Sequence, residues 1–382
     1  MQLRVCVVTG SRADYGYLHW PMKLLQDAPD FNLQVAVTGM HLDPTFGETW
    51  KDIKRDGFPI DFRVETLTGG DSARAITEAI GRGVAGFAGC FEALAPDYVM
   101  VLGDRYEILA AVEAALIARI PVAHIAGGDA SEGAFDESIR HAITKMSHLH
   151  FVTNERAAVR VRQMGENPEH VYHVGSSSLD YIRNAEFWDR GVVFEKIGMM
   201  PRARNILITF HPATLDPVAS VAQAAELLAA LDALGPDFGL VMTGSNADTE
   251  GRALTAAMSG FAQARGNAIF CESLGQALYV NALNQVDAVV GNSSSGLYEA
   301  PSFGIATVNI GERQKGRIRA SSVYDCAIDR VAITATLKTA LAADHRNTSN
   351  PYGDGKASSR ILAALRAVQD PGTLIQKAFF DA

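Results

Sequence analysis

Acidic side chains follow two strand-like apolar runs in the first half of the chain, where a sheet commonly presents catalytic groups. Asp104 and Glu107 come directly after the first of these runs. Asp136 and Glu137 begin a helical pattern beyond the second run and its glycine turn. Because ligands bind at the carboxyl ends of strands in open α/β sheets, these carboxylates are candidates for proton transfer. Each also has a structural alternative, as a helix cap, a capping-box member or a partner of the helix dipole.

Groups suited to an anion occur in the second half. The Gly-Asn-Ser-Ser-Ser-Gly segment at 291–296 follows an apolar run and opens a helical pattern, so its hydroxyls and amides are expected to bind an anion. His211 ends another apolar run, where it would contact a diphosphate or carry a proton, unless it is a satisfied core histidine. Glu299, one turn beyond the serines, either hydrogen-bonds a ribose or is a dipole partner. Arg313 lies in a cationic loop, for which solvation is the alternative.

Other polar positions of the first half are less specific. Arg12 lies in the small-residue turn after the first apolar run, where its forked cation would reach a phosphate or simply be solvated. That turn lacks the spacing of a dinucleotide-binding or P-loop motif. Asp129 belongs to an acidic loop behind a strand-like run. His148 and His150 lie nearby, but no cysteine or matching carboxylate pattern accompanies them, so a zinc site is not favoured.

Strand-like runs alternate with helical patterns throughout, which is typical of parallel sheets with crossover helices. The expected strands lie near 3–9, 33–38, 98–103, 121–126, 149–153 and 171–175, then 205–210, 239–243, 268–271, 286–291 and 305–310. The expected helices lie near 17–27, 72–94, 106–118, 136–147 and 155–164, then 217–234, 249–265, 275–284, 295–303 and 356–368. An irregular polar stretch at 180–204 separates the two series and is the expected linker.

This layout predicts an α/β protein of two doubly wound, Rossmann-like domains facing a central cleft. The first is expected at 1–180, with the C-terminal helix at about 356–382 packing back on it. The second is expected at 181–355.

Composition narrows the class of partner. The chain has 382 residues, of which 48% are apolar and 20% charged, so large buried cores are expected. A net charge of −9 without a basic block argues against nucleic acid or an anionic membrane as a partner. The N-terminus lacks the pattern of a signal peptide, and a cytoplasmic location is expected. The four cysteines are widely separated and are expected to be thiols.

The motifs, taken in order, resemble one family, the hydrolysing UDP-N-acetylglucosamine 2-epimerases, and most of all its sialic-acid and legionaminic-acid branch. The resemblance extends to about residue 320. It rests on G-S-R-A-D-Y at 10–15, T-G-M-H-L at 38–42, G-D-R-Y-E at 103–107, H-I-A-G-G-D at 124–129, D-E-S-I-R-H-A-I-T-K at 136–145, H-P at 211–212, G-N-S-S-S-G at 291–296 and G-E-R-Q-K-G-R at 311–317.

The resemblance implies a fold like that of GT-B glycosyltransferases, with the nucleotide held by the second domain. It implies elimination of UDP as a carboxylate takes the proton from carbon 2, followed by hydration to a free manno-configured amino sugar. No cofactor or metal is implied, and relatives suggest a homodimer or homotetramer. By the same matching, Asp104 and Asp136 are catalytic carboxylates, with Glu137 beside them. The matching also gives His211, Arg12, Arg313, Ser293, Ser294, Ser295 and Gly296 for the diphosphate, Glu299 for the ribose, and His41 for the first-domain cleft. Asp129 is expected as a further substrate contact.

One position departs from the family pattern. Many relatives have a glutamate where this chain has Ala126, so either Asp129 or Glu132 compensates or the pocket takes a different sugar, such as a UDP-2,4-diacetamido-2,4,6-trideoxyhexose. Two other functions stay open on the sequence alone. One is a glycosyltransferase of the same fold, and the other is a catalytically silent UDP-sugar-binding protein.

Overall fold

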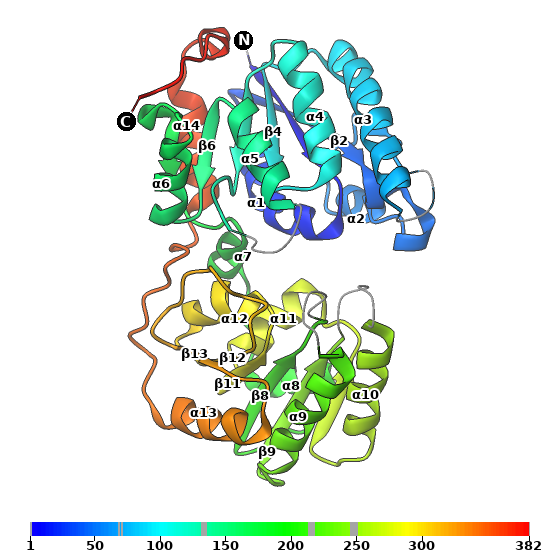
Figure 1. Cartoon of the computed structure of the whole chain (residues 1–382), viewed down its shortest axis with the longest axis vertical. Helices are drawn as coiled ribbons and strands as arrows, with labels where there is room; N and C mark the ends of the chain where they lie inside the picture. The colour runs from blue at the N-terminus through cyan, green and yellow to red at the C-terminus, as the bar shows by residue number, and fades with distance from the viewer. Residues whose placement is uncertain are drawn as a thin grey trace. The chain divides into compact units, whose positions relative to one another are not determined.

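The computed structural model describes residues 2–67, 69, 72–130, 136–212, 218–244 and 251–381, without the side chains of 251 and 252. Contacts between Cα atoms divide the chain into two compact units, Met1–Arg183 with Tyr352–Ala382, and Asn184–Pro351. Each unit contains one sheet whose strands are all parallel, with helices packed on it (Figure 1). The prediction of two doubly wound α/β domains is therefore confirmed.

In the first unit, the described strands pair in the order β3-β2-β1-β4-β5-β6-β7. They are β1 (Leu3–Thr9), β2 (Phe31–Thr38), β3 (Phe62–Val64), β4 (Tyr98–Leu102), β5 (Val122–Ile125), β6 (Leu149–Val152) and β7 (Val171–His173). The helices are α1 (Arg12–Asp27), α2 (Trp50–Arg55), α3 (Ala73–Leu94), α4 (Tyr106–Ile117), α5 (Asp136–Met146), α6 (Glu155–Gln163), α7 (Ser178–Asn184) and α14 (Ala357–Ala367).

The alternation of side chains along β1 builds a core on each face of this sheet. Val5 and Val7 pack with residues of α1 and α14, whereas Cys6 and Val8 pack with residues of α3, α4 and α5. Each fully buried aliphatic side chain contributes about 1.5–3 kcal/mol. The two faces hold the strands in register, so the loops at their carboxyl ends lie along one edge of the sheet.

In the second unit, the order is β10-β9-β8-β11-β12-β13. The strands are β8 (Arg204–Thr209), β9 (Phe238–Thr243), β10 (Ala268–Cys271), β11 (Ala288–Gly291), β12 (Ala306–Ile310) and β13 (Val323–Cys326). The helices are α8 (Arg190–Ile197), α9 (Ser220–Asp232), α10 (Gly251–Gln263), α11 (Gly275–Leu283), α12 (Ser295–Tyr298) and α13 (Arg330–Ala342). Here Ile206 and Ile208 of β8 pack on one core and Leu207 on the other.

Two sequence-based expectations about elements are wrong. The stretch at 180–204 is not irregular, because α7 extends into it and α8 lies within it, ending at Gly198 in the left-handed conformation. The helix expected at 295–303 is shorter. The α-helix α12 ends at Tyr298 and a 3-10 turn, Ala300–Phe303, follows. Pro301 lies in that turn, and proline has no N–H to continue an α-helix.

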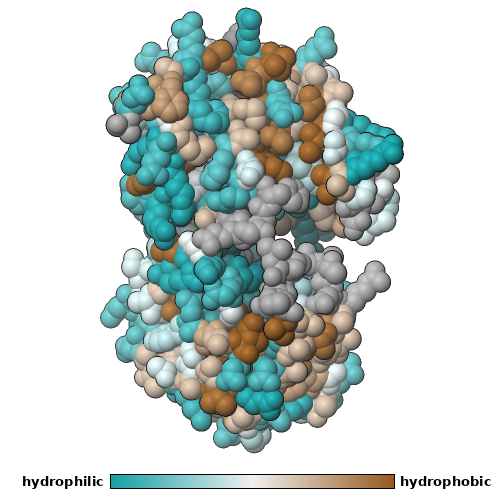
Figure 2. Space-filling view, viewed as in Figure 1, coloured by the Kyte–Doolittle hydropathy of each residue, from teal (hydrophilic) through white to brown (hydrophobic). Residues whose placement is uncertain are grey.

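The surface shows no single broad hydrophobic area on the face drawn in Figure 2, where hydrophobic residues are interspersed with hydrophilic ones. Within the described residues, no helix combines the length and the apolar character needed to cross a bilayer. The four cysteines are free thiols, and Cys6 and Cys90 are buried.

Candidate active site

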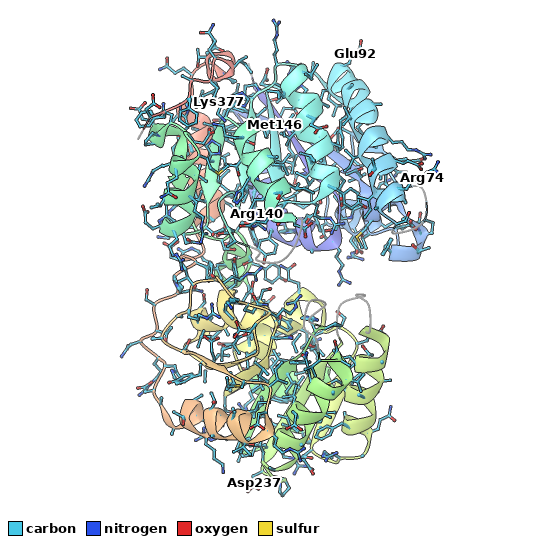
Figure 3. The ribbon with its side chains drawn as sticks, in the orientation of Figure 1. Arg74, Glu92, Arg140, Met146, Asp237 and Lys377 are labelled. Carbon is cyan, nitrogen blue, oxygen red and sulfur yellow. The ribbon has the colours of Figure 1, made fainter. Side chains whose placement is uncertain are left out.

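The carboxyl edge of the first sheet holds an ion pair between the loop after β4 and helix α5. Asp104, just beyond β4, accepts a hydrogen bond from the Arg140 guanidinium of α5. Arg140 is buried and also donates to the Glu137 carboxylate at 3.1 Å and to the main-chain oxygen of Asp129 at 2.6 Å. Figure 3 shows Arg140 toward one end of α5 and Met146 at the other. One guanidinium therefore connects the loop after β4, the loop after β5 and the first turn of α5.

The helix-cap alternative for Asp104 does not describe this geometry. The N-cap of α4 is Arg105, whose side chain makes no capping hydrogen bond. The Asp104 carboxylate instead faces the buried cation of Arg140. An acid fixed in this way at a sheet edge is suited to contact a ligand.

Asp136 is the first residue of α5 and is partly buried. Burial raises the pKa of its carboxyl, the nearby Arg105 lowers it, and Glu107 raises it. A carboxylate with a raised pKa is a stronger base than an ordinary aspartate. Glu137, in contrast, is engaged with Arg140 and lies 3.4 Å from the ring nitrogen Nε2 of His141.

Asp129 has a different environment from the other acids. Its carboxylate accepts hydrogen bonds from the Thr153 hydroxyl at 2.6 Å and from the Asn154 amide at 3.1 Å. These contacts tie the loop after β5 to the end of β6. Glu132, the other acid considered as a substitute for the missing glutamate, lies outside the described residues.

A second ionic cluster at the same edge joins Glu107, a candidate from the sequence, to Arg105 and Asp14, which the sequence analysis did not single out. The Arg105 Nε donates to the Glu107 carboxylate at 2.6 Å, and the Glu107 side chain is fully buried. Asp14 of α1 belongs to this cluster. Burial raises its pKa to about 6, while Arg105 lowers it and Glu107 raises it. The sequence did contain a signal for this cluster. Opposite charges occur in both the G-S-R-A-D-Y and the G-D-R-Y-E motif, and each motif adjoins a buried strand.

His41 is buried in a short 3-10 turn, Gly39–Leu42, that follows β2. Its Nε2 lies 2.9 Å from the Thr9 hydroxyl and its Nδ1 lies 2.7 Å from the Thr49 hydroxyl. Burial lowers the pKa of His41 to about 4, so the ring is neutral at physiological pH. Arg12 is the exposed first residue of α1. Both residues therefore lie at the carboxyl edge where β1 and β2 end.

Ala126, the position that departs from the family pattern, has a backbone conformation unusual for alanine. Its φ is +62°, in the left-handed region that costs an L-residue about 1–2 kcal/mol. Its N–H donates to the Phe151 carbonyl at 2.9 Å. The preceding strand, β5, contains His124, whose Nε2 donates to the Gly103 carbonyl at 2.8 Å. The backbone at this point is thus fixed by the neighbouring strands.

In the part of the chain that the structure describes, no group of three or more His, Cys, Asp or Glu residues is arranged to hold a metal ion. His150 has its Nε2 2.9 Å from the Glu166 carboxylate. His148 accepts the Val122 N–H at 3.1 Å.

In the second unit, His211 and Asn292 join the ends of β8 and β11. The His211 N–H donates to the Asn292 side-chain oxygen at 2.7 Å, and the Asn292 amide donates to the His211 carbonyl at 2.8 Å. Burial, together with the smaller effect of the Arg313 cation, lowers the pKa of His211 to about 4. The imidazole is therefore neutral, and the backbone that carries it is fixed at the carboxyl edge of this sheet.

The serine turn has members in different environments. The Ser295 hydroxyl is buried and accepts from the Tyr279 hydroxyl at 2.8 Å, whereas Ser293 and Ser294 are partly buried. Gly296 lets β12 lie close to the serine turn, since a Cβ on Gly296 would lie 2.6 Å from the Thr307 methyl carbon. Ser293 and Ser294 thus remain the better candidates for a ligand.

The cationic loop after β12 is attached to this turn. Arg313 and Gln314 donate to the main-chain oxygen of Asn292, at 3.2 and 2.8 Å. Glu299 is the partly buried residue between α12 and the 3-10 turn. His211, the serines and Arg313 are therefore brought together through Asn292, although they are distant in sequence.

Gly291 makes the close approach of β11 and β8 possible, which gives a stability prediction. Its φ is +141°, and a Cβ would lie 1.9 Å from the Thr209 carbonyl oxygen. We expect Gly291→Ala to destabilise the protein by about 3 kcal/mol, measured by urea unfolding. Gly260→Ala is the control, because that position on α10 is exposed with nothing within 4 Å, and a gain of about 0.5–1 kcal/mol is expected. Equal effects of the two substitutions would contradict the clash.

Known proteins are similar to this chain over most of its length. The model of the family described as UDP-N-acetylglucosamine 2-epimerase matches residues 23–366. A Legionella pneumophila protein named UDP-N,N'-diacetylbacillosamine 2-epimerase (hydrolyzing) is 35% identical over 374 residues, 98% of each chain. A Campylobacter jejuni protein named GDP/UDP-N,N'-diacetylbacillosamine 2-epimerase (hydrolyzing) is 35% identical over 327 residues, 85% of each chain.

A solved structure has a similar fold. It is the Methanocaldococcus jannaschii UDP-GlcNAc 2-epimerase in complex with UDP-GlcNAc and UDP. The TM-score is 0.76 at 16% identity, with 96% of this chain and 100% of that chain covered.

Proposed function

Since the chain belongs to the hydrolysing UDP-N-acetylglucosamine 2-epimerase family and is an epimerase, we propose that it converts a UDP-linked 2-acetamido sugar to the free manno-configured sugar and UDP. The observation that carries the proposal is the pair of acids at one sheet edge, Asp104 fixed by Arg140 and Asp136 with a raised pKa. Asp104 does not cap α4, whose N-cap is Arg105.

In the proposed reaction, Asp136 takes the proton from carbon 2. The electron pair of that C–H bond forms a double bond to carbon 1, and the bond from carbon 1 to the diphosphate oxygen breaks. Water then adds across the double bond: its hydroxyl joins carbon 1, and the proton it gives up passes to carbon 2 from the opposite face. We assign Asp104 to this second proton transfer, with Arg140 and Glu137 fixing its position. A positioned base contributes about 10²–10⁴ in rate.

The leaving diphosphate needs several donors, for which we propose groups of the second unit. Hydrogen bonds to charged groups contribute about 1.5–3 kcal/mol each, so one alone is insufficient. Ser293, Ser294, the His211 ring and Arg313 are suited to this role because they surround the fixed Asn292. We propose Glu299 for the ribose, and Arg12 of the first unit as a further phosphate contact.

We propose a UDP-2,4-diacetamido-2,4,6-trideoxyhexose as the preferred substrate over UDP-N-acetylglucosamine. Two relatives at 35% identity are named for diacetylbacillosamine, a sugar of that class. Ala126 supports the choice, since its small side chain leaves room for a changed sugar. The free product would serve nonulosonic acid biosynthesis, in which a sialic or legionaminic acid is built on a manno-configured amino sugar.

The test is incubation of the purified protein with each of the two UDP-sugars in deuterated water, followed by NMR. We expect UDP and a free manno-configured sugar carrying deuterium at carbon 2, formed faster from the diacetamido donor. UDP release without epimerised sugar would contradict the elimination step. Turnover only in the presence of a sugar acceptor would indicate a glycosyltransferase, and binding without turnover would indicate a silent UDP-sugar-binding protein.

A further inference from the structure

Glu107 lies against the loops that follow β1 and β2 in the first sheet. It is on the first turn of α4, and its side chain is fully buried. A Cβ on Gly10, after β1, would lie 2.7 Å from the Glu107 Oε1. A Cβ on Gly39, after β2, would lie 3.1 Å from the same oxygen. Two loops from separate strands therefore pack directly on this one carboxylate.

The same carboxylate fixes the cation of its own loop. The Glu107 Oε1 accepts the Arg105 Nε–H at 2.6 Å, and another Arg105 nitrogen lies 3.5 Å from the Met40 sulfur, in the turn after β2. The His41 N–H donates to the Gly10 carbonyl at 3.3 Å, which joins the first two loops to each other. Glu107 is thus the shared contact of the loops after β1, β2 and β4.

A purely structural role would leave one feature of Glu107 unexplained. Its second oxygen, Oε2, is buried without a hydrogen-bond partner among the described residues. Proteins rarely leave a buried carboxylate oxygen unpartnered, because its desolvation is not compensated. Such arrangements occur preferentially at functional sites, where a charge is needed in a fixed position.

We propose that Glu107 is a positioning residue for the reaction proposed above. It does not contact the reacting atoms. It fixes the Arg105 guanidinium and the loops after β1 and β2 beside Asp136. The inference rests on the proposed function for its meaning, but the placement of the groups can be tested without turnover. Charged and titratable groups from four elements act on one another here: Asp14 of α1, His41 in the turn after β2, Arg105, Tyr106 and Glu107 at the start of α4, and Asp136 of α5.

The sign of the electrostatic effect follows from these neighbours. Glu107 raises the pKa of Asp136 and Arg105 lowers it. Glu107→Gln removes the first influence and leaves the Arg105 charge without its partner. Both changes lower the pKa of Asp136, so Asp136 becomes a weaker base.

The first measurement is the pH dependence of kcat for the wild type and for Glu107→Gln. We expect kcat to fall about tenfold to a hundredfold, because small misplacements of reacting groups have effects of that size, with the acid limb moving to lower pH. Glu166→Gln is the matched control. Glu166 is equally buried in the same unit, where it pairs with His150, Lys145 and Lys377. The Glu166→Gln substitution should lower the melting temperature without changing kcat or the pH at which the acid limb lies.

The second measurement does not depend on activity. In protein labelled with ¹³C at aspartate carboxyls, the Asp136 signal is assigned by its loss in Asp136→Asn and titrated in wild type and Glu107→Gln. A lower midpoint in Glu107→Gln supports the inference, and an unchanged midpoint overturns it. If the wild type shows no turnover, the proposed function is wrong, but the titration still tests the inference about Glu107. If Glu107→Gln does not fold, Glu107→Asp replaces it. That variant keeps the charge, so a near-normal Asp136 midpoint with lowered kcat is expected, and a normal kcat overturns the inference.

Discussion

Asp136→Asn is expected to lower kcat by about 10³-fold or more while the protein stays folded, because the proposed base for carbon 2 is lost. The amide is nearly isosteric with the carboxyl but cannot accept a proton. If Asp136 only complemented the dipole of α5, the substitution would cost about 0.3–1 kcal/mol of stability and leave the rate unchanged. Steady-state kinetics together with thermal unfolding separate these two roles.

Glu155→Gln provides the control for Asp136→Asn. Glu155 is the first residue of α6, as Asp136 is of α5, but its side chain is 63% exposed. We expect a small loss of stability and an unchanged kcat. If both substitutions altered kcat equally, or neither did, Asp136 would have no special role in the reaction.

The pH profile of the wild type follows from the same residue. The base acts only when deprotonated, and the pKa of Asp136 is raised above its ordinary value of 3.8. Activity should therefore fall as the pH decreases through this raised pKa, so the acid limb of kcat/KM lies above the limb of an ordinary aspartate. The limb should be absent from the residual activity of Asp136→Asn.

Arg140→Met is expected to destabilise the protein by about 3–5 kcal/mol and to remove most activity. Arg140 is 7% exposed and Asp104 is 21% exposed, so the substitution leaves a largely buried carboxylate without its cation. The main-chain oxygen of Asp129 loses its donor as well. Urea unfolding measures the free energy, and addition of Asp104→Asn should recover part of it.

Arg360→Met is the control for a surface pair. Arg360 and Asp354 are 42% and 49% exposed, and such pairs contribute about 0–1 kcal/mol. If this substitution destabilised the protein as much as Arg140→Met, burial of the Asp104–Arg140 pair would not be the cause of the effect.

Long, regular elements of this fold were predictable because their apolar patterns are strong. The ends of the central strands agree with the sequence-based ranges to within about two residues. The edge strands β3 and β13 were missed, being short and only partly buried. Helix α13 was missed because its β-branched residues blur the helical pattern.

The site was predictable at the level of loops and not of contacts. The sequence placed Asp104, Asp136 and the serine turn after strands, but it gave no reason to join Asp104 to Arg140. That contact depends on the order of β4 and β5 in the sheet and on the start of α5. The sequence also did not distinguish Ser295, whose hydroxyl accepts a hydrogen bond from Tyr279, from Ser293 and Ser294. Such distinctions are set by tertiary packing, which spacing along the chain does not encode.

The return of the C-terminal residues to the first unit has a consequence for biosynthesis. The segment Asn184–Pro351 is continuous, whereas the other unit lacks α14 until Tyr352–Ala382 has been made. Helix α14 supplies Ile361 and Leu365 to the core against β1. On the ribosome, the second unit can thus acquire its full core while the first still exposes apolar surface, and that surface is where chaperones would bind the nascent chain.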